Sequence, residues 1–446
     1  MNALTADTIT VDLLERMLAA NPRDGGAWST LGVLLRRTGQ LHAAAACHRR
    51  GIEFDPNHGG IWSNLGNVLT EIGDYEEACA AHEQAFRLTP TVASTQFNRA
   101  IALRKAGRFT EAVEMLDLGL AQDPDNPTLL WERALSLLQI GEYSRGFQAY
   151  EARLRIPSYR NRIPDGTPWD GSPLNGRTLF VSTEQGFGDA LLMTRYLPLL
   201  KAYGGRVILE CHPELQRVLS GLEGVDAILT AGAPLPAYDV HASLMGLPRL
   251  LGTTVDTVPP PVRLSVPDEA RAKAAQLLGP ANGAFRVGIV WSGRITFADN
   301  GRRATSLDRF LRFLGVPGTQ FYSLQKGPPE EQLAKLGTEL LIRPLGPHLN
   351  DFSETAAVVE QLDLVLMTDS SVAHLAGSLG RPVWNLVQYV PYWIYGHKGD
   401  RTPWYPSMRL FRQGLDENWD SVFDAARAAL AEAVAAKART AELVSS

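Results

Sequence analysis

The chain has 446 residues, of which 45% are hydrophobic and 20% are charged, the balance of a globular protein with room for about three domains. Its net charge of -5 lacks the basic character expected of a nucleic-acid-binding protein. The N-terminal residues do not resemble a signal peptide, and no stretch approaches the roughly 20 apolar residues of a membrane span. We therefore expect a cytoplasmic protein without a membrane span and without nucleic acid as a partner.

A repeat with a period of 34 residues occupies the first third of the chain. The period appears in four prolines, Pro22, Pro56, Pro90 and Pro124. It also appears in two tryptophans and four glycines, Trp28, Trp62, Gly39, Gly73, Gly107 and Gly141. Such glycines end a first helix and the prolines stop a second one, which is the pattern of tetratricopeptide repeats.

Four such repeats are predicted, at 24–56, 57–90, 91–124 and 125–157, after a half-repeat helix at 11–20. Because each helix pair contacts only its neighbours, the stack forms a curved surface whose concave side commonly takes an extended peptide. We therefore expect a domain at 1–157 that binds a protein acceptor or partner. The alternative is a spacer or a dimerisation surface that binds no peptide.

Several residues of this domain have the side chains of metal ligands without the spacing that a metal needs. His48 and His82 occupy one repeat position, at which a buried packing residue is expected. Asp123 and Asp125 form an acid-x-acid pair, but they lie in an inter-repeat turn. The three cysteines of the whole chain, Cys47 and Cys79 in this domain and Cys211 beyond it, also lack metal-ligand spacing and are predicted to be reduced.

The composition changes after the repeats. Residues 158–176 are rich in Pro, Gly, Asn and Asp and are predicted to form a linker. Strand-like runs then alternate with helical ones, which indicates parallel βαβ units. A proline-rich break at 257–269 divides these units into two halves, at 177–265 and 266–446. The expected strands are 178–183, 206–211, 226–230 and 239–244, and then 285–291, 319–324, 340–343, 364–368 and 383–386.

The predicted fold is therefore an α-helical repeat solenoid followed by two Rossmann-like α/β halves, the arrangement called GT-B, with a closing helix at 419–437. In such halves, ligands bind at the carboxyl ends of the strands. The first strand of the first half is followed by a turn with Gly186 and Gly188, an acid at Asp189 and a helix at 190–203. The glycines let a ligand approach the backbone, and Asp189 is placed for proton transfer.

The second half offers an anion site. The run Asp369, Ser370, Ser371 follows a buried strand and precedes a helix that begins near residue 372, with His374 on its first turn. Free N–H groups and the dipole of a helix start favour a phosphate by about 0.3 to 1 kcal/mol. The alternative is that Ser370 is a simple helix cap, which leaves His374 unexplained.

Two further loops are predicted to reach the same edge. Trp291 ends one strand and is followed by a loop with Arg302 and Arg303, and Gln325 and Lys326 follow the next strand. We expect these residues to bind substrate, the arginines by neutralising a departing diphosphate. The alternative for either arginine is a solvated surface position.

Five runs carry a resemblance to a known family: EQGFGDALLMTRYLP, GIVWSG, SLQKG, LDLVLMTDSSVAHLAG and WYPSMRLFRQ. They resemble bacterial proteins that fuse tetratricopeptide repeats to a glycosyltransferase domain similar to lipopolysaccharide heptosyltransferases and, more distantly, to O-GlcNAc transferases. The resemblance covers about residues 24–413. The run Pro391 to Tyr395 departs from the tryptophan-arginine-tryptophan run usual in those relatives, which leaves the donor sugar open.

The resemblance implies an inverting, metal-independent glycosyltransferase that uses a nucleotide diphosphate sugar and no other cofactor. It makes Asp189 the general base of an acceptor-binding first half, and Asp369, Ser370, Ser371 and His374 the diphosphate site of the second. The expected acceptor is a protein hydroxyl, by family analogy that of flagellin. The alternatives are transfer to a lipopolysaccharide or polysaccharide, a scaffold with a degenerate transferase domain, and a sugar-nucleotide epimerase, which would need extra acids that the sequence does not reveal.

Overall fold

The computed structural model describes residues 10–157, 164–296 and 300–445. By its contacts the chain divides into two compact units, Met1–Ile140 with Gln148–Arg153, and Gly141–Phe147 with Leu154–Ser446. Part of the predicted linker, 158–163, and part of the predicted arginine loop, 297–299, lie outside the described residues.

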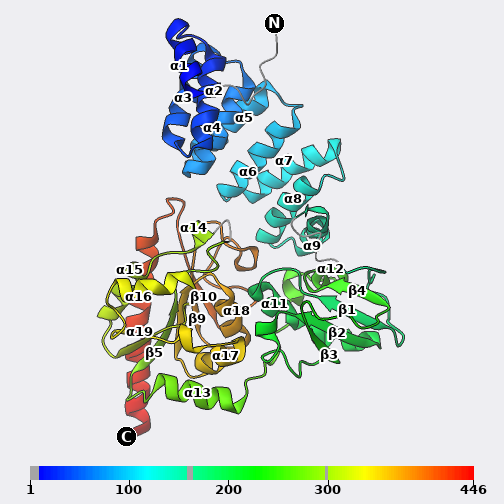
Figure 1. The fold of residues 1–446 in the computed structure, drawn as a ribbon, viewed down its shortest axis with the longest axis vertical. Helices are drawn as coiled ribbons and strands as arrows, with labels where there is room; N and C mark the ends of the chain where they lie inside the picture. The colour runs from blue at the N-terminus through cyan, green and yellow to red at the C-terminus, as the bar shows by residue number, and fades with distance from the viewer. Residues whose placement is uncertain (1–9, 158–163, 297–299, 446) are drawn as a thin grey trace. The chain divides into compact units, whose positions relative to one another are not determined.

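The first unit is a stack of helix pairs (Figure 1). Helix α1 (Val11–Ala20) precedes the pairs, as predicted. The pairs are α2 (Gly25–Arg37) with α3 (Leu41–Phe54), α4 (Gly59–Ile72) with α5 (Tyr75–Leu88), and α6 (Ala93–Lys105) with α7 (Phe109–Gln122), and α8 (Pro127–Gln139) follows them. Helix α9 (Tyr143–Tyr150) and η2 (Glu151–Arg155) are divided between the two units. The turns inside the pairs use the four predicted glycines, which all have positive φ, for example 97° at Gly73.

One hydrogen bond recurs with the repeat period and explains part of the pattern. The indole of Trp28 donates to the carbonyl of Pro22 at 2.9 Å, and the indole of Trp62 donates to that of Pro56 at 2.8 Å. In the third repeat Gln96 stands in place of the tryptophan, and its amide donates to the carbonyl of Pro90 at 2.9 Å. The third repeat therefore keeps the bond although it lacks the tryptophan.

The two repeated histidines are buried packing residues, as predicted. His48 and His82 are both 0% exposed. Each ring lies against a glycine of the preceding helix, so that a Cβ at Gly32 or Gly66 would lie 2.7 or 2.6 Å from it. The cysteines are also free and buried, as predicted.

The first half of the second unit is a four-stranded parallel sheet in the order β3-β2-β1-β4. Its strands are β1 (Thr178–Ser182), β2 (Arg206–Cys211), β3 (Ala227–Thr230) and β4 (Val240–Ser243). Its helical segments are α11 (Phe187–Met193), η3 (Thr194–Tyr203), η4 (Pro213–Leu215), η5 (Leu244–Gly246), α12 (Leu247–Leu250) and η6 (Val255–Thr257).

The second half is a six-stranded parallel sheet in the order β10-β9-β8-β5-β6-β7. Its strands are β5 (Phe285–Val290), β6 (Thr319–Ser323), β7 (Ile342–Pro344), β8 (Leu364–Thr368), β9 (Val383–Val387) and β10 (Met408–Arg412). Its helical segments are α13 (Asp268–Leu278), α14 (Asn300–Arg303), α15 (Leu307–Phe310), η7 (Leu311–Gly315), η8 (Pro328–Glu331), α16 (Gln332–Lys335), η9 (Gly346–His348), α17 (Phe352–Glu360), α18 (Ser371–Ser378), η10 (Trp393–Tyr395) and α19 (Trp419–Ser445).

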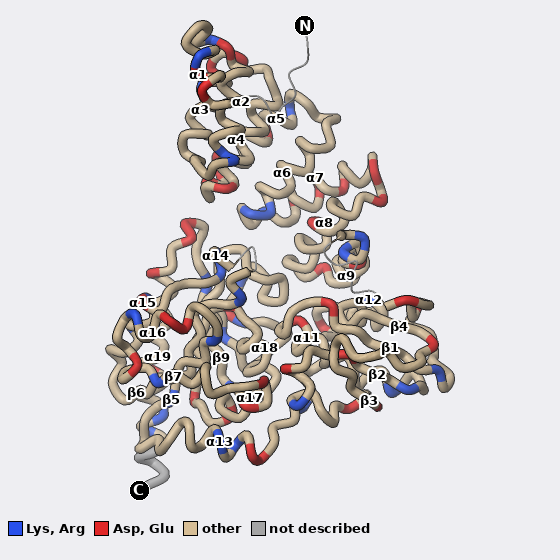
Figure 2. The backbone as a smooth tube through the Cα atoms, in the orientation of Figure 1, with Lys and Arg blue, Asp and Glu red and all other residues tan. Residues whose placement is uncertain are grey.

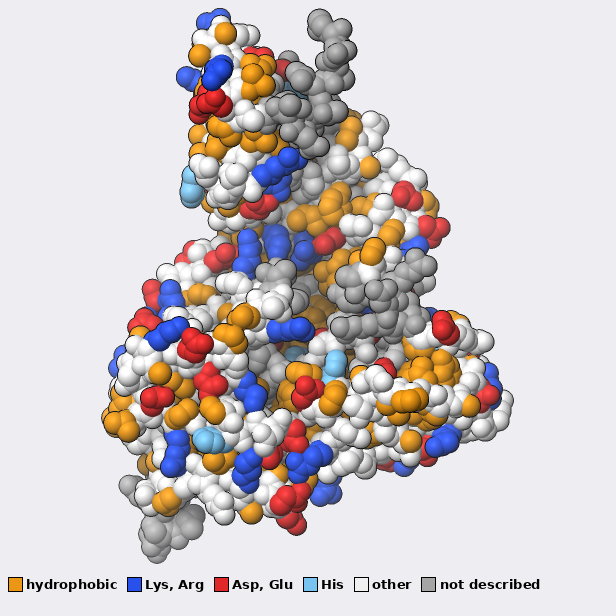
Figure 3. Space-filling view, viewed as in Figure 1, with side chains coloured by type: hydrophobic (Ala, Val, Ile, Leu, Met, Phe, Trp, Pro, Cys, Tyr) orange, Lys and Arg blue, Asp and Glu red, His pale blue; other side chains and the backbone are white. Residues whose placement is uncertain are grey.

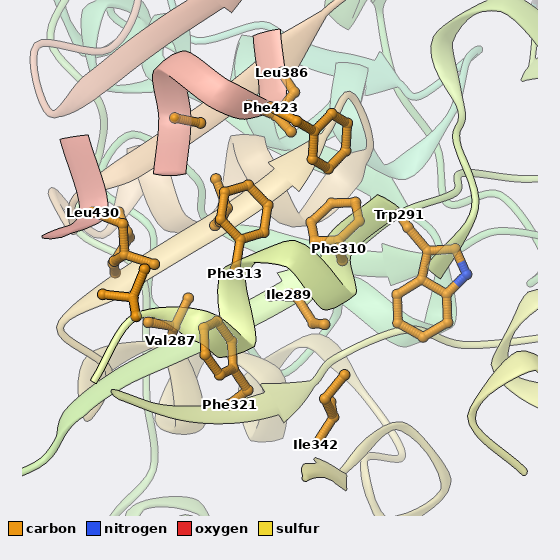
Figure 4. Close-up of a cluster of buried hydrophobic side chains, with 14 of the residues drawn as sticks. Val287, Ile289, Trp291, Phe310, Phe313, Phe321, Ile342, Leu386, Phe423 and Leu430 are labelled. Carbon is orange, nitrogen blue, oxygen red and sulfur yellow. The ribbon is translucent and has the colours of Figure 1, made fainter. Parts of the chain in front are cut away.

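The main core of the second half lies between the sheet and helix α19 (Figure 4). Phe310 and Phe313 pack against Phe423 of α19, with ring centroids 5.2 and 5.5 Å apart. Val287 and Ile289 of β5 join the same cluster. The apolar face of α19 thus covers one face of the sheet, which leaves the loops at the strand ends to form a site.

The predicted fold class is confirmed, with three local differences. Strand β10 was not predicted. The helix expected at 190–203 is α-helical only to Met193 and continues as the 3-10 helix η3, in which Pro198 removes a backbone donor. Helix α19 also extends past the predicted end at 437.

The described residues include no helix that is long and apolar enough to cross a membrane. Acidic and basic residues are both scattered over the backbone of each unit (Figure 2). On the face of the second unit seen in Figure 3, side chains of the two signs are likewise interspersed.

Candidate functional site

The turn after β1 places a carboxylate at the edge of the first sheet. Gly186 is the N-cap of α11, and Asp189 lies at the third position of that helix. Asp189 Oδ2 accepts the backbone N–H of Gly186 at 3.1 Å. This bond satisfies one of the N–H groups that a helix start leaves unpaired. The turn thus fixes the direction of the Asp189 side chain.

The second oxygen of Asp189 has a partner from the other half. Asp189 Oδ1 accepts a hydrogen bond from the hydroxyl of Tyr392 at 2.8 Å. Burial raises the pKa of Asp189, while the bonds from Tyr392 and Gly186 oppose that rise. A carboxyl whose pKa is raised in this way is a stronger base when it is ionised, as a proton acceptor in catalysis requires.

The structure gives the two predicted glycines different surroundings. A Cβ at Gly188 would lie 2.7 Å from Cδ2 of His374, so this glycine lets α11 and α18 pack closely. A Cβ at Gly186 would meet only Asp189 Oδ2, at 3.5 Å. Close contact with a ligand, which we expected of both glycines, therefore remains a prediction for Gly186. For Gly188 the close neighbour is the protein itself.

The predicted anion site lies on the other side of this contact. Asp369 follows β8, and its Oδ1 accepts from the hydroxyl of Tyr395 at 2.7 Å. Its Oδ2 lies 3.8 Å from a guanidinium nitrogen of Arg303. Ser370 is the N-cap of α18, yet its side chain makes no capping hydrogen bond within the described structure. The alternative of a simple serine cap is thus not what the structure shows.

His374 lies on the first turn of α18 but is buried, with 4% of its surface exposed. Its Nδ1 is 3.2 Å from the hydroxyl of Tyr405. Burial lowers the pKa of His374 to about 4, so the ring is neutral near pH 7. A neutral ring can still donate one N–H, but His374 does not supply a positive charge to a phosphate in this conformation.

The two predicted arginines point to different partners. Arg303 lies against Gly293, where a Cβ would come within 2.5 Å of its guanidinium, and its charge faces Asp369. Arg302 instead lies 3.5 Å from Glu417. The structure therefore brings Arg303 to the candidate anion site and places Arg302 beside an acid outside it.

Two other predicted residues, Gln325 and Lys326, make hydrogen bonds within the protein. The amide of Gln325 accepts from the N–H groups of Trp291 and Ser292 and donates to the carbonyls of Ser292 and Lys326. The ammonium of Lys326 donates to the carbonyls of Gly346, at 3.0 Å, and Leu349. These contacts tie together the loops after β5, β6 and β7.

Trp291 is fully buried in the core of the second half, where Figure 4 shows it beside Ile289 and Phe310. The prediction that its side chain binds substrate is therefore not met in this conformation. The physical reason is the alternation of side chains along a strand, which turns this one toward the core.

Sequence reasoning missed the tyrosines of the site. Tyr392, Tyr395 and Tyr405 each place a hydroxyl on one predicted residue, namely Asp189, Asp369 and His374. For Tyr392 and Tyr395 the available signal was the aromatic run from residue 391 to 395, which differs from the run usual in the resembling family. The departure from the family run does not by itself indicate a role for these tyrosines.

A buried arginine also joins the two halves at this place. The guanidinium of Arg195, in η3, lies over the rings of Trp404 and Tyr405, at 5.0 and 4.8 Å from their centroids. Its guanidinium donates to the carbonyls of Trp404 and Pro259 at 2.8 and 3.1 Å. Since Tyr405 also contacts His374, Arg195 helps to fix the position of α18 relative to α11.

No group of three or more His, Cys, Asp or Glu side chains among the described residues could hold a metal ion. The polar groups that meet at the strand ends are instead two carboxylates, a guanidinium, tyrosine hydroxyls and the start of a helix. Such a set can accept a proton on one side and stabilise an anion on the other.

Known proteins resemble parts of this chain. Residues 59–125 and 97–160 match tetratricopeptide-repeat families. These matches agree with the periodic glycines and prolines and with the helix pairs described above, so tetratricopeptide repeats form the N-terminal region.

A curated relative, "Protein FlbA" of Caulobacter vibrioides, is 29% identical over 296 residues, which are 60% of this chain and 48% of that protein. The match thus spans about half the length of the relative. Among solved structures, a "glycosyl transferase family 9" protein from Veillonella parvula is 14% identical and covers 55% of this chain and 88% of its own, with a TM-score of 0.44. YrrB, "a TPR protein with an unusual peptide-binding site", is 17% identical and covers 34% and 79%, with a TM-score of 0.31.

Proposed function

We propose that the chain is an inverting, metal-independent glycosyltransferase that moves a sugar from a nucleotide diphosphate sugar to a hydroxyl group. One observation carries the proposal. Asp189, a carboxylate with a raised pKa, lies at the carboxyl end of a strand in one parallel sheet, and α11, which carries it, packs against α18, whose start lies at the corresponding edge of the other sheet. Ligands of doubly wound α/β folds bind at such strand ends.

The roles follow from the chemistry of each group. Asp189 takes the proton from the acceptor hydroxyl, and the oxygen attacks the anomeric carbon of the sugar. The bond from that carbon to the phosphate oxygen breaks, and the diphosphate leaves with the electron pair. Because the attack is a single displacement from the opposite face, the configuration inverts.

The leaving diphosphate needs stabilisation that the second half can supply. The backbone N–H groups at the start of α18 and the hydroxyls of Ser370 and Ser371 are suited to phosphate oxygens. Arg303 adds a positive charge, which at present lies 3.8 Å from Asp369. A diphosphate would compete with Asp369 for Arg303, so donor binding would change the surroundings of that carboxylate.

We further propose that the acceptor is a protein hydroxyl, selected by the repeats. Tetratricopeptide repeats present a concave surface that commonly takes extended peptides. Flagellin is the proposed acceptor by analogy with the family that the sequence resembles.

A thermal-shift experiment tests the donor part of the proposal. The protein is heated with a panel of nucleotide diphosphates and their sugars, with and without EDTA. We expect one nucleotide class to raise the unfolding temperature, since a ligand that binds the folded state stabilises it, and we expect EDTA to leave that rise unchanged. A rise that EDTA abolishes and Mn²⁺ or Mg²⁺ restores would contradict the assignment of the leaving-group site to Arg303 and the start of α18.

A further inference from the structure

Asp189, the carboxylate assigned as the base, already accepts a hydrogen bond from a hydroxyl group of the protein. The phenol of Tyr392 donates to Asp189 Oδ1 at 2.8 Å, from a residue 203 positions further along the chain. This is the arrangement that an acceptor alcohol must take before Asp189 removes its proton. The Tyr392 hydroxyl is thus the donor in this bond, and Asp189 Oδ1 is the acceptor.

Hydrogen bonds to its carbonyl groups fix the backbone that follows Tyr392. Thr402 donates to the carbonyl of Ile394 at 2.5 Å, and Arg412 donates to the carbonyls of Tyr395 and Gly396. The Tyr395 side chain is buried and bonded to Asp369. The segment therefore has fixed points directly after Tyr392.

The Tyr392 side chain itself is only half-buried. Its ring packs edge-on against His374 and tilted against Trp393, with centroids 6.3 and 5.3 Å away. A rotation about its own side-chain bonds can move the hydroxyl away from Asp189 while the anchored backbone stays in place. Such rotamer changes are fast compared with enzyme turnover.

We propose that Tyr392 is a guard of the acceptor site: its hydroxyl occupies the place of the acceptor hydroxyl on Asp189 until the acceptor displaces it. This inference rests on the proposed function and deepens it. Without the guard, Asp189 would take a proton from water, the water oxygen would bond to the anomeric carbon, and the diphosphate would leave with the electron pair of the broken bond. The donor sugar would then be lost to hydrolysis.

The first test needs no donor. Asp189 and Asp369 are labelled with a water-soluble carbodiimide and an amine, and labelling is measured by peptide mass spectrometry in the wild type, Tyr392→Phe and Tyr395→Phe. We expect Tyr392→Phe to raise labelling of Asp189 by about tenfold, the effect of losing one hydrogen bond to a charged group, and to leave Asp369 unchanged. Tyr395→Phe is the matched control and should raise labelling of Asp369 instead. Unchanged labelling of Asp189 in Tyr392→Phe overturns the proposal.

The second test measures nucleotide release without an acceptor, from the donor that the thermal-shift panel identifies. We expect Tyr392→Phe to release nucleotide about tenfold faster than the wild type, because water gains access to the base. A variant that releases nucleotide no faster than the wild type overturns the guard, whatever the labelling shows. Failure of the proposed function is a separate result, since it appears as an absence of donor binding in the thermal-shift panel.

Discussion

At the scale of single residues, two adjacent arginines of α14 have different partners, and only one of them lies at the candidate site. Arg303 packs on Gly293 and faces Asp369 across 3.8 Å, whereas Arg302 faces Glu417 across 3.5 Å. Both were expected to neutralise a leaving diphosphate. Only Arg303 now has a position that suits this role.

The pair offers a matched test. Arg303→Gln should weaken the binding of the nucleotide diphosphate by about tenfold to a hundredfold, since a hydrogen bond to a charged group contributes about 1.5–3 kcal/mol. Arg302→Gln should leave the affinity nearly unchanged. Isothermal titration of both variants decides the matter, and equal losses in the two would remove Arg303 from the anion site.

The sequence predicted where the functional residues lie more reliably than what their side chains contact. Asp189 and Asp369 could be found because the end of a parallel strand is visible as an apolar run followed by small and acidic residues. The bond from Tyr392 to Asp189 could not be found, because it joins residues far apart in the chain. Gln325 follows its strand as predicted, but its amide bonds to neighbouring loops, and spacing alone does not distinguish such a residue from one that binds a ligand.

At the scale of elements, the repeats use two ways to pack one helix on the next. The first two repeats place a histidine ring over a glycine, in the pairs Gly32 with His48 and Gly66 with His82. The same positions of the third repeat hold Ala100 and Leu116, which are both buried. The glycine is needed only where the ring is present, because a Cβ would lie within 3 Å of it.

These buried histidines should make the repeats less stable in acid. Burial lowers the pKa of His48 and of His82 from 6.5 to about 4. The unfolded chain therefore binds more protons between these values, so stability is fully present above pH 6.5 and is lost as the pH falls toward 4. The shift corresponds to about 3 kcal/mol for each histidine.

Hydrogen exchange of α4 and α5, measured by mass spectrometry across this pH range, tests the assignment. The double variant Gly66→Ala with His82→Leu places the residue types of the third repeat, Ala and Leu, at these two positions. Its exchange rates in α4 and α5 should lose part of the pH dependence seen in the wild type. Equal pH dependence in the two proteins would mean that His82 is not a source of the acid sensitivity.

Most strands could be predicted from the sequence to within one or two residues, because most are short and largely buried apolar runs such as β1, β5 and β8. Helix ends were harder. The segment after Asp189 has the apolar spacing of one long helix, but Pro198 and the local backbone make its second part a 3-10 helix. Strand β10 was missed because arginines stand at two of its five positions, so its MRLFR run does not read as a buried strand.

At the scale of the whole molecule, the two units do not divide where the repeats end. Residues Gly141–Phe147, the start of the last repeat helix, belong to the second unit. Tyr143 and Phe147 are buried there, and the indole of Trp404 donates to the hydroxyl of Tyr143 at 2.8 Å. A domain boundary at 157, as expected from the repeat pattern, would assign Tyr143 and Trp404, which are hydrogen-bonded to each other, to different domains.

A truncated chain that begins at residue 141 should therefore keep its affinity for the nucleotide and lose modification of the protein acceptor. A chain that begins at residue 156 is the matched control, because it also lacks Tyr143 and Phe147. Removing buried aromatic side chains costs about 3–5 kcal/mol each, so this control should unfold at a lower temperature. Equal acceptor modification by the intact chain and the chain from 141 would show that the repeats do not select the acceptor.

The most direct test of the account is the rate of sugar transfer by Asp189→Asn. The amide oxygen can still accept the N–H of Gly186, and the amide nitrogen can donate to Tyr392, so the fold and the donor affinity should be kept. An amide cannot take the proton of the acceptor, and the loss of a placed base typically costs about 10² to 10⁴ in rate. We predict a fall of that size with an unchanged dissociation constant for the donor. Near-normal transfer by Asp189→Asn would contradict the account, because Asp189 would then serve only the structure of the turn.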